Sequence, residues 1–161
     1  MTTPQTDTPT SRATLVEQVR AFHEKYAAPV DEFVETLDLK DVLEVDKFAQ
    51  ELHSWSMKLR HRDAGRPFSI ARQRLSLLTE ELAELADGMV SGDEEEVFDA
   101  ICDLNYLVAG SAVAYGMPLD EGTAEVHRSN MTKDVGEFKP IKGPDYSEPN
   151  LYPILVKLGR A

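Results

Sequence analysis

Residues 69–115 read SIARQRLSLLTEELAELADGMVSGDEEEVFDAICDLNYLVAGSAVAY, and this stretch decides the fold. Its first half predicts a helix over residues 69–90, because apolar residues recur at helical spacing on one face. The residues of that face, which we expect to point toward a core, are Leu75, Leu78, Leu82 and Leu85. Ser69 precedes them as a typical N-cap residue.

The second half of the stretch predicts another helix, over residues 94–115. Asp93 is its expected N-cap and Glu96 the partner in a capping box, while Gly116 and Pro118 end it. The residues expected to face inward are Val97, Ile101, Leu104, Leu107, Val108 and Ser111. Because the connection around residues 87–93 is short, the two helices should be antiparallel neighbours.

The rest of the chain also favours helices. They are predicted over residues 15–28, 45–59 and 119–130, and no run alternates apolar and polar residues as a strand would. The class is therefore all-α, a helical bundle. We expect a disordered tail at 1–11 and a single domain at 12–161, with an extra helical segment at 31–68 and an irregular tail at 134–161.

Composition limits the partners and the compartment. The formal net charge of −12 disfavours binding to nucleic acid, whose backbone is also negative. A single cysteine, Cys102, is typical of a reducing cytosol, and the first residues do not resemble a signal peptide. No uncharged apolar run reaches the roughly 20 residues that a membrane span needs. We therefore expect a cytoplasmic protein without a membrane partner.

Acidic side chains cluster on the two central helices. Glu81 and Glu84 are three residues apart and so point to nearly the same side. On the next helix Glu96, Asp99 and Asp103 fall within about 60° of one another at 100° per residue. Asp103 interrupts an apolar sequence, where a charge is costly unless it is paired or binds a metal. Such oxygen ligands suit Mg²⁺ or Mn²⁺.

A cation held there would bind the phosphates of a small anionic substrate, and Glu80 is a candidate general base for an attacking water. The plainer interpretation is that a Glu-Glu-x-x-Glu sequence marks an ordinary solvated helix face.

A basic patch follows the acidic helices. In it Lys133 and Lys142 are candidates for contacting phosphates, Asn130 for bonding a base or sugar, and Tyr146 for stacking on a base. The alternative is that both lysines are ordinary surface residues.

Four stretches together resemble the MazG-like nucleotide pyrophosphohydrolases, closest to the branch of phosphoribosyl-ATP pyrophosphohydrolase-like proteins. They are EELAEL at 80–85, EVFDAICDLNYL at 96–107, EVHRSNMTK at 125–133 and KPIKGPDYSEPNL at 139–151. The opening VRAFHEKYAAP at 19–29 is also similar, whereas residues 31–68 show no resemblance. The resemblance implies an all-α bundle that assembles as a dimer or tetramer and cleaves nucleoside triphosphates with Mg²⁺.

The resemblance also implies roles for single residues. Glu81 and Glu84 match the metal ligands of one helix and Asp103 that of the next, while Asn130 and Lys133 match residues at the nucleotide. Ala100 stands where a glutamate is expected, so Asp99 is the first candidate to complete the site and Glu96 the second.

Three functions stay open at this point. The first is a house-cleaning hydrolase of nucleoside triphosphates such as dUTP, which would release monophosphate and pyrophosphate. The second is a phosphoribosyl-ATP pyrophosphohydrolase of histidine synthesis, which the long amino-terminal extension and the KGPDY tail argue against. The third is a bundle that binds nucleotides without cleaving them, an alternative that Ala100 supports.

Overall fold

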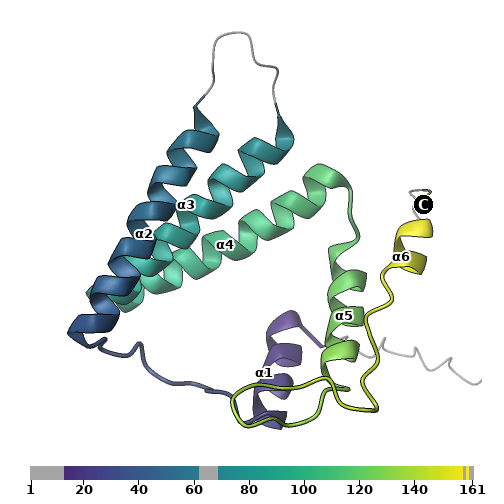
Figure 1. Ribbon diagram of the computed structural model, residues 1–161. Helices are drawn as coiled ribbons and strands as arrows, with labels where there is room; N and C mark the ends of the chain where they lie inside the picture. The colour runs from purple at the N-terminus through teal and green to yellow at the C-terminus, as the bar shows by residue number, and fades with distance from the viewer. Residues whose placement is uncertain (1–12, 62–68, 158, 160–161) are drawn as a thin grey trace, which may run out of the picture. The chain divides into compact units, whose positions relative to one another are not determined.

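The computed structural model describes residues 13–61, 69–157 and 159, so the predicted tail at 1–11 lies outside it. The described helices are α1 (Leu15–Lys25), α2 (Leu39–Arg60), α3 (Ile70–Ser91), α4 (Glu94–Tyr115), α5 (Leu119–Asn130) and α6 (Tyr152–Val156) (Figure 1). Among the described residues there is no strand, only an isolated antiparallel bridge between Asp134 and Ile141. The predicted all-α bundle class is confirmed.

Contacts divide the chain into two compact units. The first combines Met1–Asp31 with Asp120–Ala161, and the second is Glu32–Leu119. The expectation of a single domain therefore stays a prediction. The predicted extra segment at 31–68 contains all of α2, whose N-cap is Asp38 and which begins six residues before the predicted helix at 45. Residues 62–68 of that segment lie outside the described part.

The caps predicted for α3 and α4 are present. The Ser69 hydroxyl accepts the Arg72 amide at 3.3 Å, and the Asp93 carboxylate accepts the amides of Glu95 and Glu96 at 3.0 and 3.3 Å. The predicted capping box at α4 is wrong, because the Asp93 amide that Glu96 would accept donates to the Gly88 carbonyl at 3.1 Å instead.

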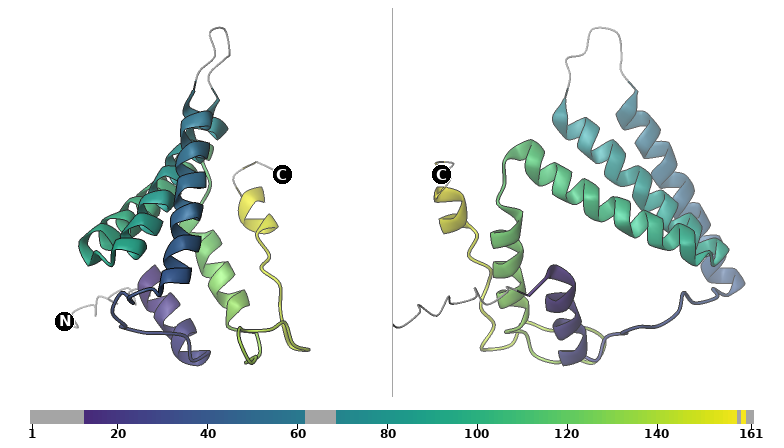
Figure 2. Two further views of the ribbon diagram at one scale, coloured as in Figure 1. Left: turned by 60° about the vertical axis from the view of Figure 1, so that its left-hand side comes forward. Right: turned by 180° about the vertical axis from the view of Figure 1, so that it is seen from behind.

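In the second unit α3 contacts both α2 and α4, and Figure 2 shows these helices alongside it from two further sides. The buried residues of these contacts are small: Ala49 and Ser56 on α2, Ser76, Ala83, Ala86 and Gly88 on α3, Val97 and Ala100 on α4. A Cβ added at Gly88 would lie 3.0 Å from the Val97 backbone nitrogen, so α3 and α4 approach closely there. The predicted leucine core is wrong in part, since Leu75 is 53% exposed and Leu82 38%.

The side of α4 that points away from α3 is also apolar. Phe98, Tyr106 and Val113 are 68%, 76% and 81% exposed. Ile101 and Val108, predicted to face inward, are about half exposed. By length and composition alone α4 is the one described helix that could cross a membrane, although core helices of soluble proteins pass the same test.

The first unit is held together near the ends of α1 and α5. α1 stops at Lys25, three residues before the predicted end, and Tyr26 follows as its C-cap. The Tyr26 hydroxyl lies 3.0 Å from the Asn130 carbonyl and 2.6 Å from the Lys133 carbonyl. The predicted irregular tail after residue 134 is otherwise without regular structure as far as α6, within the described residues.

Candidate functional site

The carboxylates of α3 and α4 come together around Glu81. Its pKa is raised to about 7, first because its carboxyl is withdrawn from water and then by the negative charges of Glu84, Asp103 and Glu80. A side-chain hydrogen bond with Glu84, which a protonated Glu81 can make, acts in the same direction. The charges of Glu84 and Asp103 are therefore near enough to influence Glu81, and the metal site predicted from these three residues stays a prediction.

One carboxylate oxygen of this cluster has no hydrogen-bond partner. Glu81 Oε2 is buried and accepts no hydrogen bond. A buried acceptor without a partner is costly, and crowded negative charges add to that cost. A proton or a cation bound at this oxygen would give it a partner and would also reduce the repulsion between the carboxylates. A hard divalent cation prefers such oxygen ligands. The donor set fits Mg²⁺, although no three His, Cys, Asp or Glu side chains of the described residues are already arranged to hold a metal ion.

Asp103 itself is exposed in the single chain, as are most of its neighbours on α4. The expectation that it sits in a buried apolar setting is therefore wrong for this chain alone. Asp103 nevertheless acts on Glu81, because its negative charge helps to raise the pKa of Glu81.

The two candidates for a further ligand lie closer to the amino-terminal end of α4 than Asp103 does. Asp99 and Glu96 border a hollow of about 550 Å³, together with Asp93, Glu95, Phe98 and Cys102. Ala100, where the resemblance led us to expect glutamate, is 3% exposed and belongs to the contact face of α4. Neither Asp99 nor Glu96 is among the charges that raise the pKa of Glu81. The structure does not bring them to the cluster, and which of them completes a metal site stays a prediction.

Glu80, the candidate general base, forms an ion pair with Arg60 of α2. This contact holds the Glu80 carboxylate on the α2 side of α3, and its charge still contributes to the raised pKa of Glu81. A role as base would require the Glu80 carboxylate to reach the attacking water from this position.

The four predicted nucleotide-contacting residues belong to the first unit. The backbone carbonyls of Asn130 and Lys133 accept from Tyr26, as described above. Lys142 Nζ lies 4.8 Å above the Tyr146 ring and 3.5 Å from the Glu148 carboxylate. Because the acidic cluster belongs to the second unit, the joint action of the two sets stays a prediction.

Sequence reasoning missed what the EVHRSNMTK stretch does structurally. Glu125 accepts the Asn150 amide at 2.8 Å and also accepts from Nε and Nη2 of Arg128, and the Thr132 hydroxyl accepts the Ser147 amide at 2.8 Å. These bonds attach the tail to α5. Side-chain-to-backbone bonds have no periodicity, so no pattern in the sequence indicated them.

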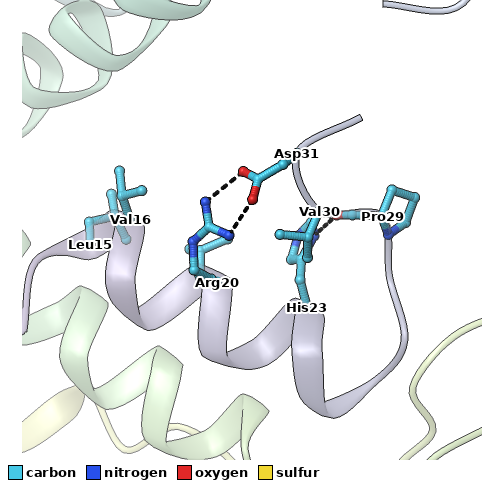
Figure 3. A pocket seen from close by; sticks show the side chains of 8 residues that line it. Leu15, Val16, Arg20, His23, Pro29, Val30 and Asp31 are labelled. Carbon is cyan, nitrogen blue, oxygen red and sulfur yellow. Dashed lines mark hydrogen bonds and ion pairs between the residues drawn. The ribbon is translucent and has the colours of Figure 1, made fainter. Parts of the chain in front are cut away.

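A second hollow lies along α1 and holds about 360 Å³ (Figure 3). Leu15, Val16 and Val19 give it apolar walls. Its charged residues are already paired, since both Arg20 end nitrogens contact the Asp31 carboxylate at 2.7 and 2.8 Å. No predicted site residue lines it.

Residues 37–130 match the model of a family described as phosphoribosyl-ATP pyrophosphohydrolase. The match covers more than half of the chain and contains Glu80, Glu81, Glu84, Glu96, Asp99, Asp103 and Asn130. It also covers most of residues 31–68, so the expectation that this segment falls outside the resemblance is wrong. α1 and the tail with Lys133, Lys142 and Tyr146 lie beyond it. No curated protein and no solved structure matches the chain.

Proposed function

The chain belongs to the phosphoribosyl-ATP pyrophosphohydrolase family, and we propose that it hydrolyses nucleoside triphosphates to monophosphate and pyrophosphate with the help of Mg²⁺. That it is a nucleotide pyrophosphohydrolase follows from the family. The choice of triphosphates, including non-standard ones such as dUTP, is our proposal. The observation that carries the metal-dependent mechanism is the buried, unpartnered oxygen of Glu81 among the charges of Glu84 and Asp103.

Pyrophosphohydrolases of this family generally use divalent metal ions. Glu81, Glu84 and Asp103 would hold the ion, and Asp99 or Glu96 would add a further oxygen. When bound, it would screen the charge of the phosphates and lower the pKa of a coordinated water. The carboxylates then have a second effect, because their remaining negative charge repels any phosphate that is not accompanied by a cation.

The reaction breaks one phosphoanhydride bond. Water attacks one phosphorus, its proton passes to a carboxylate, and the bond to the pyrophosphate leaving group breaks. We assign the proton to Glu80, provided that its carboxylate turns from Arg60 toward the cluster. Catalysis of this type depends on placing the water in line with the leaving oxygen, so rigid helices are a suitable support.

Phosphoribosyl-ATP is the second candidate substrate, and the family's description favours it. The same bond would break, between the two phosphates nearest the nucleoside. Against it stand the segments outside the matched region, α1 and the tail fastened to α5, which a compact dedicated enzyme does not need.

We also propose that the protein is a homo-oligomer, a dimer or tetramer. The uncovered apolar face of α4, with Phe98, Tyr106 and Val113, is the support for this. A second copy seated there would place Asp103 in the apolar setting that its sequence suggests. The charges at Asp99 and Asp103 make a membrane a poor alternative partner for α4.

The test is an activity panel. Purified protein is incubated with Mg²⁺ and with ribo- and deoxyribonucleoside triphosphates, dUTP and phosphoribosyl-ATP, and the release of pyrophosphate is measured. Turnover of triphosphates supports the proposal, and turnover of phosphoribosyl-ATP alone selects the second candidate. Metal-dependent binding without any product would instead indicate a nucleotide-binding bundle. In a turning-over enzyme Asp103→Ala should abolish activity at unchanged helix content.

A further inference from the structure

Arg74 lies on α3 in the seam between α3 and α4, on the face that carries the carboxylate cluster. It precedes Glu81 by seven residues, which is nearly two full turns, so the two side chains leave the helix in almost the same direction. At 1.5 Å per residue their backbones are about 10 Å apart along the axis. Figure 2 shows the two helices of this seam running side by side.

The Arg74 guanidinium rests on the backbone of α4. Its Nη2 donates to the Leu107 carbonyl at 3.3 Å, and that carbonyl also accepts from the Ser111 hydroxyl at 2.8 Å. A Cβ at Gly110 would lie 3.2 Å from Nη2, so the guanidinium occupies the space that this glycine leaves. Leu107 and Gly110 follow Asp103 by four and seven residues and share its stripe of α4. Both helices thus place the cation in line with the carboxylates.

Most of this guanidinium's bonding capacity is unused. Nε is buried without a partner, and no carboxylate among the residues that the structure describes pairs with Arg74. Arginine keeps its charge and five donors at every physiological pH. The pKa of Glu81 is raised by carboxylates and is not lowered by Arg74, so the cation does not neutralise the cluster. In a chain with a net charge of −12, such an unpaired, half-buried cation calls for an anion from outside.

We propose that Arg74 binds a phosphate group of the nucleotide's phosphate chain, at the end farther from the carboxylates. This inference rests on the proposed function. The planar guanidinium matches two oxygens of one phosphate, so it would set the direction of the chain along the seam. Phosphates accompanied by Mg²⁺ would meet the carboxylates, and the phosphate at the other end would meet Arg74. The substrate class is therefore a nucleotide whose phosphates form a chain long enough to bridge the two positions.

The test measures the binding of inorganic pyrophosphate to the full chain in the presence of Mg²⁺ by titration calorimetry. Arg74→Gln should raise the dissociation constant at least about tenfold, as expected for the loss of a charge-assisted contact. Arg72→Gln is the matched control, because Arg72 donates to the Lys58 and His61 carbonyls on the α2 side. It should leave the constant within about twofold of the wild type. No binding by the wild type, or equal binding by Arg74→Gln, overturns the inference.

A second variant covers the case in which Arg74→Gln does not fold. Arg74→Lys keeps the charge and the apolar stem but loses the planar pair of donors, so it should bind pyrophosphate more weakly than the wild type. If this variant bound pyrophosphate with wild-type affinity and had normal helix content by circular dichroism, the role of the planar pair of guanidinium donors would be refuted.

The two proposals fail differently. Nucleotide turnover with pyrophosphate binding independent of Arg74 removes only the inference. Arg74-dependent pyrophosphate binding without turnover of any nucleotide removes only the proposed function.

Discussion

Replacing Glu81 with glutamine should stabilise the metal-free protein at alkaline pH. The change keeps the size of the side chain and removes one of the crowded charges. The carboxyl has a pKa of about 7 in the folded chain and 4.5 as its ordinary value. At 1.36 kcal/mol per pKa unit this difference corresponds to about 3 kcal/mol of destabilisation. Because Glu81 keeps partial contact with solvent, screening should reduce the effect to about 1–2 kcal/mol.

The pH window follows from the raised pKa. Between about pH 4.5 and 7 the unfolded chain has lost the Glu81 proton while the folded chain keeps it, so the free energy of unfolding falls as pH rises. Above pH 7 the full penalty is present. Glu81→Gln carries no such proton, so variant and wild type should have similar stability near pH 4.5 and differ by the full amount at pH 8.

The assay is thermal unfolding in a metal chelator at pH 4.5 and pH 8, at equal protein concentrations. At pH 8 the variant should melt roughly 2–8 °C higher than the wild type. Asp99→Asn is the control, because Asp99 is an exposed carboxylate outside the cluster and its removal should not produce this gain. Mg²⁺ should stabilise the wild type at pH 8 and stabilise Glu81→Gln less. A variant no more stable than the wild type at pH 8 would refute the crowding on which the site rests.

Three further changes test other parts of the structure. The pKa of Glu125 is lowered to about 2 by its bonds to Arg128 and Asn150, so the stability that these bonds contribute is complete above pH 4.5 and is lost as pH falls toward 2. An NMR titration of the Asn150 amide should follow this loss, and the pH-dependent change should be absent from Glu125→Gln. Gly136→Ala should loosen the tail and increase its cleavage by protease, because the added Cβ would lie 2.3 Å from the Lys139 backbone carbonyl oxygen. Val113→Asp should shift an oligomer toward monomer in light scattering, and an unchanged mass would place the interface elsewhere.

The convergence of the carboxylates could be predicted because it depends only on helical spacing and a short antiparallel connection. The side of α4 that contacts α3 could not be predicted from the sequence. Apolar residues surround most of this helix, so its hydrophobicity predicted Ile101 and Val108 to be buried together with Val97, whereas only Val97 and Ala100 are buried. Hydrophobicity identifies what prefers to be buried, but close approach of two helices depends on small side chains.

The contacts of Arg74 and of the tail could not be predicted from the sequence either. Arg74 is two turns from the acidic motif, and its importance appears only when Gly110 of α4 is seen beside it. The tail is tied by single bonds such as that between Thr132 and Ser147, which join residues of different segments without any repeating pattern.

The bonds from Tyr26 to Asn130 and Lys133 have a consequence for the order of events during synthesis. They join residues 104 and 107 positions apart, and everything from Glu32 to Leu119 lies between them. When α1 and its C-cap Tyr26 leave the ribosome, the residues that Tyr26 bonds to do not yet exist. The middle unit can complete its own helix contacts first, and the loop that it closes shortens the search by which the two ends meet. The segment made first should therefore be among the last to become ordered.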